Sequence, residues 1–184
     1  NKSWPYREAN PDHEFLAPNY RMTDLQGAIG RAQLPRLEEV VRRRQENAQQ
    51  FFDLLGDLPG VTLPRPFEGD EHSYWKMPLW IDDGVIEGGV DAVSARLSEM
   101  GVFNAPHYVG KPAFHCAIFR NRSTYGQSQC PWSCRLKQDG VDVVYDDADF
   151  PGAFEGLRRV LVLAWNEHYT SEHVEQIAEA VRQA

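Results

Sequence analysis

The sequence has little of three features that would point to a membrane, a nucleic acid or an oxidising compartment. It contains no apolar run long enough to cross a bilayer, so a membrane-spanning protein is not expected. Its 19 basic residues are outnumbered by 27 acidic residues, and the formal net charge of -8 argues against nucleic acid or an anionic membrane surface as the main partner. Because only 3 cysteines are present and no signal peptide is recognisable, we expect a reducing cytoplasm.

The composition is that of an ordinary globular protein. Of 184 residues, 42% are hydrophobic and 25% are charged, which is enough for one good core or two small ones. The segment 1–18 has loop composition, and its first residue is not methionine. We therefore expect the sequence to begin partway through a longer chain, with part of any active site outside it.

Two consecutive helices are predicted in the first third of the chain. Thr23 is suited to cap a helix from residue 24 to about 34, which Pro35 should break or kink. Apolar residues then recur at helical spacing over 37–55, opposite a face rich in arginine and glutamine. Two glycines inside the first helix should each cost about 1 kcal/mol relative to alanine, which indicates close approach by another backbone or helix.

The rest of the chain predicts short strands and further helices. Strands are expected at 61–63, 74–81, 102–108 and 158–165, and helices at about 90–100 and from Thr170 or Ser171 to the end. The region 110–152 is expected to be a long loop with at most a short helix. This pattern predicts an α+β fold, in which long entry helices are followed by a small, mostly antiparallel sheet with helices on one face. The predicted division is 1–57 for the entry segment and 58–184 for a small C-terminal domain.

The segment YWKMPLWI alternates as a half-buried strand should. Its odd-numbered residues, Trp75, Met77, Leu79 and Ile81, are all apolar and are expected to face the core. Pro78 lacks an N–H and favours an edge or a bulge.

Two short polar stretches are candidate binding sites. Asn19, Tyr20 and Arg21 place an amide, a phenol and a guanidinium directly before the first helix, and arginine is well shaped for a carboxylate or phosphate. In PHYVGKP, a strand-end loop carries His107, Tyr108 and Lys111. The alternatives are an ordinary loop arginine and a satisfied surface histidine.

No metal site is predicted. His115 and the three cysteines, Cys116, Cys130 and Cys134, offer only a loose C-x3-C spacing without a second tight pair. The acidic residues at 146–149 lack the glycine turn and distal glutamate of a calcium loop, and we interpret them as a solvated face. The S-x-x-K spacing from Ser73 to Lys76 falls in a strand pattern, so it does not indicate an acyl-transfer site.

Longer motifs give the sequence a family resemblance. The segment NYRMTDLQGAIGRAQLPRL closely resembles the DegT/DnrJ/EryC1/StrS family of pyridoxal-phosphate aminotransferases, in which N-Y-R-M-T/S-[DE]-[LI]-Q-A-A precedes an A-Q-L helix. The blocks HEFLAP, RRR, HSYWK, HYVGKP, STYGQSQCPW and VLAWNEHYTSEHVEQIAEAV resemble successive parts of the C-terminal half of these enzymes, in order. The resemblance extends over essentially the whole chain.

The resemblance implies fold type I architecture, a homodimer, and pyridoxal 5'-phosphate as cofactor. It implies amino transfer from glutamate or glutamine to a keto-sugar or cyclitol. By the same resemblance, Asn19 approaches the cofactor phosphate of the partner subunit, with Tyr20 and Arg21 as neighbours. The loop that carries His107, Tyr108 and Lys111 would border the sugar pocket.

One departure from the family limits what this chain does alone. The chemistry needs a lysine that forms a Schiff base with the cofactor, and in the family this lysine lies upstream of N-Y-R. The four lysines here, Lys2, Lys76, Lys111 and Lys137, lie outside that block, so no catalytic residue is expected in this chain. The alternatives are a sugar dehydratase of the same family, with histidine in place of the lysine, and a non-catalytic binding module on the same scaffold.

Overall fold

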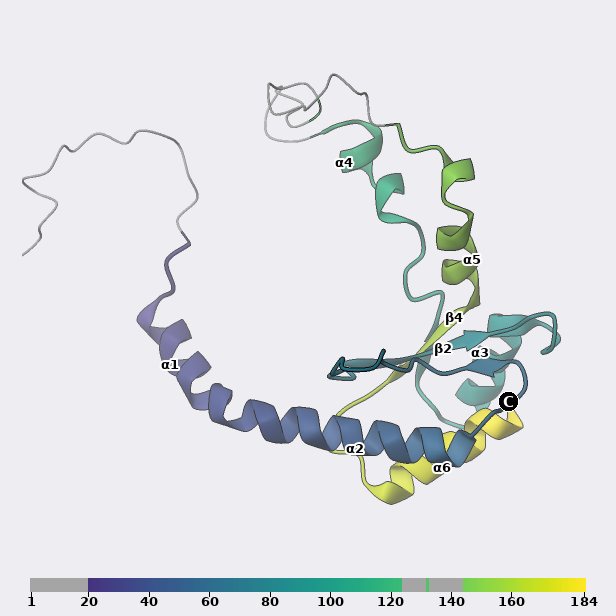
Figure 1. Ribbon diagram of the computed structural model, residues 1–184, viewed down its shortest axis with the longest axis horizontal. Helices are drawn as coiled ribbons and strands as arrows, with labels where there is room; N and C mark the ends of the chain where they lie inside the picture. The colour runs from purple at the N-terminus through teal and green to yellow at the C-terminus, as the bar shows by residue number, and fades with distance from the viewer. Residues whose placement is uncertain (1–19, 124–131, 133–143) are drawn as a thin grey trace, which may run out of the picture. The chain divides into compact units, whose positions relative to one another are not determined.

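The structure, a computed structural model, describes residues 20–123, 132 and 144–184 (Figure 1). It divides the chain into two compact units, Asn1–Leu37 and Glu38–Ala184. Within the described ranges, no helix is both long and apolar enough to span a membrane. Asn19, Cys130 and Cys134 lie outside the described residues. The predicted boundary at residue 57 stays a prediction.

The first unit contains helix α1 (Asp24–Gln33) and the 3-10 helix η2 (Leu34–Arg36). Thr23 caps α1 as predicted: its Oγ1 accepts from the backbone N–H of Gln26 at 3.2 Å, and the Gln26 side chain accepts from the Thr23 N–H at 2.9 Å. No residue of α1 is buried. Within the described residues, α1 is therefore stabilised by hydrogen bonds within its own segment and not by a buried face.

The second unit is an α+β layer, which confirms the predicted fold class. Its elements, in chain order, are α2 (Leu37–Leu55), β1 (Val61–Thr62), β2 (Lys76–Ile81), α3 (Gly89–Glu99), β3 (Asn104–Pro106), η3 (Ala113–His115), α4 (Ala117–Arg120), η4 (Asp147–Asp149), α5 (Pro151–Arg159), β4 (Val160–Ala164) and α6 (Ser171–Gln183). The strands form one antiparallel sheet in the order β1-β2-β4-β3.

Pro78 is accommodated because the sheet is open beside it. It pairs with Val162 of β4 on one side, whereas β1 reaches only Trp80 and Ile81 on the other. A missing N–H is tolerated where no neighbouring strand needs it. Pro78 therefore lies at a local edge of the sheet, as predicted, although β2 is paired on both sides at Trp80.

The core lies between one face of the sheet and helices α2, α3 and α6 (Figure 1). The largest fully buried side chains, with less than 2% exposure, come from both layers and are Phe51, Met77, Leu79, Ile81, Val93, Leu97, Leu161, Leu163 and Val174. Lys76, Pro78 and Trp80 alternate with the buried residues of β2 and so belong to the opposite face, here called the outer face. Helix α5 packs against β2 at one end of this face, where Gly156 lies next to the Trp80 ring.

Two features differ from the sequence-based expectation. Trp75 does not continue the buried face of β2, since it is 65% exposed and β2 begins only at Lys76. The cause is Tyr74, whose positive φ of 45° turns the chain before the strand starts. The second difference is α5, which begins at Pro151 and takes in Arg158 and Arg159, two residues expected in the last strand.

Candidate functional site

The predicted phosphate-binding segment lies directly before α1. Tyr20 is 90% exposed and Arg21 is also exposed. The N-terminus of α1 carries a partial positive charge, which favours an anion beside these residues. The apolar side chains of Leu25, Ile29 and Leu34 are exposed as well. The role of Tyr20 and Arg21 in cofactor binding stays a prediction.

His107 directs both ring nitrogens toward neighbouring helices. Its Nδ1 lies 3.3 Å from the carbonyl oxygen of Leu157 in α5, and its Nε2 lies 3.2 Å from Oδ1 of Asp91 in α3. Its backbone N–H donates to the Val160 carbonyl at 3.2 Å, and its φ is 48°. A cavity of about 440 Å³ lies beside it. These partners give His107 a role in holding the loop after β3, and its predicted substrate contact stays a prediction.

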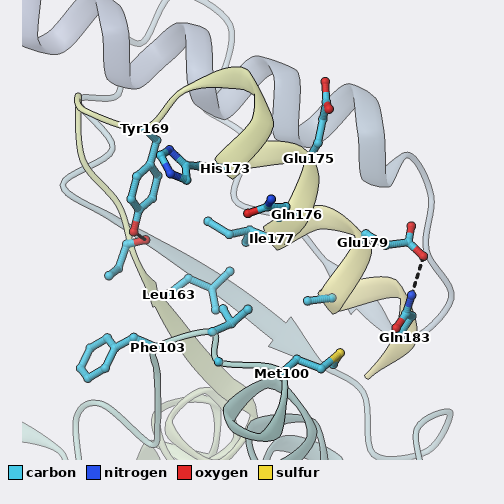
Figure 2. Close-up of a pocket in the computed structure, with 14 residues that line it drawn as sticks. Met100, Phe103, Leu163, Tyr169, His173, Glu175, Gln176, Ile177, Glu179 and Gln183 are labelled. Carbon is cyan, nitrogen blue, oxygen red and sulfur yellow. Dashed lines mark hydrogen bonds between the residues drawn. The ribbon is translucent and has the colours of Figure 1, made fainter.

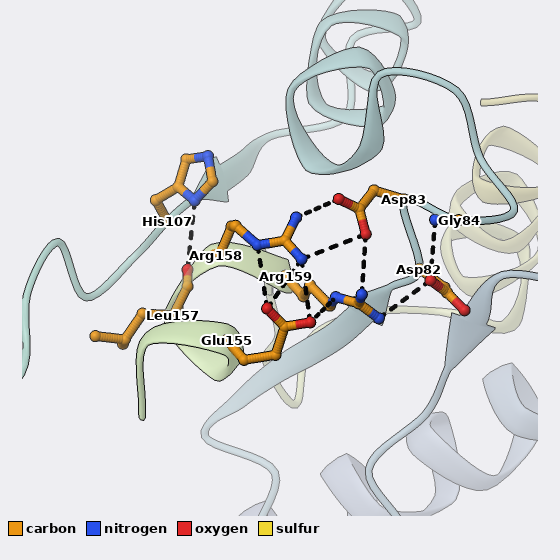
Figure 3. A network of polar contacts seen from close by, with 8 residues as sticks. All are labelled: Asp82, Asp83, Gly84, His107, Glu155, Leu157, Arg158 and Arg159. Carbon is orange, nitrogen blue, oxygen red and sulfur yellow. Dashed lines mark hydrogen bonds and ion pairs between the residues drawn. The ribbon is translucent and has the colours of Figure 1, made fainter. Parts of the chain in front are cut away.

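An ion-pair network fixes the end of α5 that approaches this loop (Figure 3). Arg158 pairs with Asp83, and Arg159 lies 3.1 Å from both Asp82 and Asp83. Glu155 contacts both arginines, although Nε of Arg159, at 2.7 Å, lacks hydrogen-bond alignment with it. Hydrogen bonding to Arg158 holds the pKa of Asp83 below its ordinary value. The network ties α5 to the loop between β2 and α3.

Tyr108 lies near Trp75 and Lys76, two residues for which the sequence predicted no binding role. Nζ of Lys76 is 4.8 Å from the centroid of the Trp75 ring and 4.8 Å from that of Tyr108. This is within the range of cation–π attraction. We call Trp75, Lys76 and Tyr108 the aromatic–lysine cluster. Lys111 is exposed a few residues further along the same loop.

A larger cavity than the one beside His107, of about 750 Å³, lies elsewhere (Figure 2). Met100, Phe103, Leu163 and Ile177 give it an apolar wall, and α6 supplies its polar rim. Burial raises the pKa of Tyr169, whose hydroxyl donates to the Ala164 carbonyl at 3.4 Å. His107, Tyr108 and Lys111 do not line this cavity.

His115 belongs to an aromatic cluster and faces a carboxylate. Its Nε2 lies 2.5 Å from Oδ1 of Asp147, and Phe114 stacks on Tyr145 with ring centroids 5.8 Å apart. The described residues contain no group of three or more His, Cys, Asp or Glu side chains that could hold a metal ion. Asp147 is therefore the partner of a histidine, a pairing that its sequence neighbourhood did not reveal.

A family model matches this chain, and so do curated proteins, two of which are described here. The model for the DegT/DnrJ/EryC1/StrS aminotransferase family matches residues 4–146. The spore coat polysaccharide biosynthesis protein SpsC of Bacillus subtilis (strain 168) is 26% identical over 185 aligned residues, which cover 99% of this chain and 40% of SpsC. GDP-perosamine synthase of Vibrio cholerae is 36% identical over 70 residues, which cover 38% of this chain and 19% of that protein.

Solved structures show the same fold. DesV of S. venezuelae, solved in complex with a ketimine intermediate, superposes with a TM-score of 0.67 at 20% identity. The match covers 97% of this chain and 41% of DesV. The chain thus spans well under half the length of these relatives.

Proposed function

The chain belongs to the DegT/DnrJ/EryC1/StrS aminotransferase family, and on this premise we propose that it is the C-terminal part of a pyridoxal-phosphate-dependent aminotransferase. The parent enzyme would move an amino group from glutamate or glutamine to a keto-sugar or cyclitol. The observation that carries this proposal is the family match over residues 4–146, which takes in both candidate binding stretches. The names of SpsC and GDP-perosamine synthase, which refer to a polysaccharide and a sugar nucleotide, support a sugar as acceptor.

The described residues fit only one edge of a pyridoxal-phosphate site. Tyr20 and Arg21, beside the N-terminus of α1, are suited to the phosphate, and Asn19 directly precedes them. Of the lysines in the described ranges, Lys76 lies between two rings and Lys111 is exposed, and neither pairs with a carboxylate there. By the family resemblance, the Schiff-base lysine and the rest of the cofactor pocket would lie in a segment upstream of this chain.

The chain's own residues would bind the cofactor phosphate and orient the sugar acceptor. When bound, the cofactor supplies the electron sink of the reaction. Asn19, Tyr20 and Arg21 would hold its phosphate, across the interface of a cytoplasmic homodimer. His107, Tyr108 and Lys111 would border the sugar, and His107 would also hold their loop against α3 and α5. Holding the acceptor near the cofactor converts an encounter between molecules into a step within one complex.

The experiment that tests this proposal uses the full-length parent protein. With glutamate or glutamine as donor and a nucleotide-linked keto-sugar as acceptor, the amino sugar should form, and replacement of the upstream lysine by alanine should abolish its formation. Loss of a hydroxyl without amino transfer, with histidine at the lysine position, would show the dehydratase instead. No turnover and no lysine would show the non-catalytic module.

A further inference from the structure

An apolar groove lies between α6 and the turn that joins α3 to β3 (Figure 2). Helix α6 borders this cavity of about 750 Å³ from His173 to Gln183, a rise of about 15 Å. Met100 and Phe103 line the opposite side, and Leu163 of β4 lines it as well. We call this cavity the α6 groove. It extends along about three turns of α6, which is the length of a short helical segment.

The turn after α3 brings two large apolar side chains to the α6 groove. Helix α3 ends in a Schellman motif, in which Gly101 adopts φ 79° and the N–H of Val102 donates to the Leu97 carbonyl at 2.8 Å. Beside this turn, Met100 is 40% exposed and Phe103 is 76% exposed. Large apolar side chains that are exposed together at the edge of a cavity are typical of an interaction surface.

Helix α6 offers apolar side chains to the groove in addition to those that it buries in the core. Val174, Ala178 and Val181 are buried in the core cluster. Ile177 and Ala180, three positions apart, line the groove. A helix that only covers a core carries polar residues beside its buried stripe. The apolar residues beside the stripe of α6 therefore indicate a second packing surface.

The rim of the α6 groove is acidic. Glu175 and Glu179 lie about one turn apart on α6, and the described residues that line the groove include no lysine or arginine. Hydrogen bonding to Gln183 and Arg182 lowers the pKa of Glu179, so this carboxylate is charged at neutral pH. Glu175 has no ion-pair partner among the described residues. An occupant with positive charges one helical turn apart would complement this rim.

The charge of the groove argues against a second copy of this chain as the occupant. In a two-fold contact the same surface lies on both sides of the interface, so the carboxylates of Glu175 and Glu179 would face their own counterparts. Like charges placed opposite each other weaken an interface. The formal net charge of -8 adds repulsion between copies. A basic partner is favoured for the same reasons.

We propose that the α6 groove is a docking site for a basic amphipathic helix of a different protein. Apolar side chains of that helix, at helical spacing, pack between Phe103 and Ile177, and its lysine or arginine residues pair with Glu175 and Glu179. The interaction goes beyond the proposed amino transfer, since His107, Tyr108 and Lys111 do not line this groove.

Binding of labelled synthetic peptides to the 184-residue chain, measured by fluorescence anisotropy, tests this proposal. The probe is a peptide of about 15 residues that forms a helix with leucine on one face and lysine on the other. One control peptide has the same composition in an order that separates the leucines, and another has glutamate in place of lysine. The first peptide should bind at micromolar concentration, and the two controls should not.

Two variants of exposed residues examine the two parts of the contact. Phe103→Ala should weaken binding of the probe about tenfold, because a large aromatic anchor is lost. Glu175→Lys should weaken it about threefold, and by less at high salt, because the contact is electrostatic. The matched controls are Phe67→Ala, at a residue that is 85% exposed, and Glu68→Lys, which changes the net charge equally. Neither residue lines the groove, so both should leave the affinity unchanged.

Four results would overturn the proposal. Equal losses in Glu68→Lys and Glu175→Lys, or equal binding of the peptide with separated leucines, would show an unspecific attraction of cations. Binding to the 184-residue chain but not to the full-length parent enzyme would show that the parent covers the groove itself. A dimer of the chain that Phe103→Ala dissociates would assign the groove to a second copy.

Discussion

Replacing Gly27 and Gly30 by alanine should stabilise α1 in this chain. Neither glycine has a positive φ, so alanine can adopt the same backbone. A Cβ at Gly30 would meet no atom within 4 Å, and one at Gly27 would meet only Sδ of Met22 at 3.7 Å, an ordinary van der Waals contact. Among the described residues, nothing therefore opposes the higher helix propensity of alanine.

The expected gain in stability follows from helix propensity alone. Each replacement should contribute about 1 kcal/mol, so the double variant gains about 2 kcal/mol in helix stability. This corresponds to amide exchange in α1 that is slower by up to about 30-fold, since 1.4 kcal/mol is a factor of ten. A ten-residue helix without buried side chains is only marginally stable in water, so the starting protection should be low. Strand β4, with Leu161 and Leu163 buried, should be protected equally in both proteins.

Hydrogen exchange measured by mass spectrometry checks this on the purified chain. Ala28→Gly, on the same helix, is the control and should accelerate exchange. In the full-length parent, where we expect a neighbouring helix or subunit to pack on the glycines, the alanine variant should instead weaken dimerisation. If α1 of the unaltered chain is as protected as β4 in a monodisperse monomer, or if alanine leaves its exchange unchanged, the reasoning is refuted.

Three further predictions concern the cofactor and the ion-pair network. The isolated chain should neither stably bind pyridoxal phosphate nor transaminate, and a visible absorption band that borohydride fixes onto one of its four lysines would contradict this. In the parent enzyme, Asn19→Ala should weaken cofactor retention more than it alters substrate preference; unchanged cofactor affinity with a shifted sugar preference would point to another role. Because bonding to Arg158 lowers the folded-state pKa of Asp83, its stabilising contribution should be complete above about pH 4 and lost as pH falls through the lowered value. The difference in unfolding free energy between the unaltered chain and Asp83→Asn should therefore shrink in acid, and a difference independent of pH would refute this.

The elements that sequence predicted well are those fixed by neighbours along the chain. Thr23 caps α1 and Thr170 caps α6 through bonds to residues three positions later, which short motifs reveal. The alternation of Met77, Leu79 and Ile81 likewise reports one buried face directly. The α+β class follows from these local patterns, since each apolar face needs a layer to cover it.

Helix α5 was not predicted, and its end in particular depends on distant partners. Arg158 and Arg159 precede six apolar residues and continue a strand pattern when only neighbours are considered. In the structure both side chains reach acidic residues after β2, more than 70 positions away. Pro151 at the first turn was a local signal for the start of this helix, but no local signal marked its end.

The aromatic–lysine cluster was hidden for a related reason. Tyr74 is at once a core residue and a strained bend, because its ring packs on Phe52 and lies 4.4 Å from that of His72, while its N–H donates to Nδ1 of His72 at 2.8 Å. Glycine would relieve the strain at this position and would lose that packing. Alternation alone assigns Trp75 to the core, and only the bend before it sends the ring to the surface. A candidate site formed by strained bends is therefore recognised from backbone angles in the structure. A candidate site beside a helix cap can be predicted from the sequence motif of the cap.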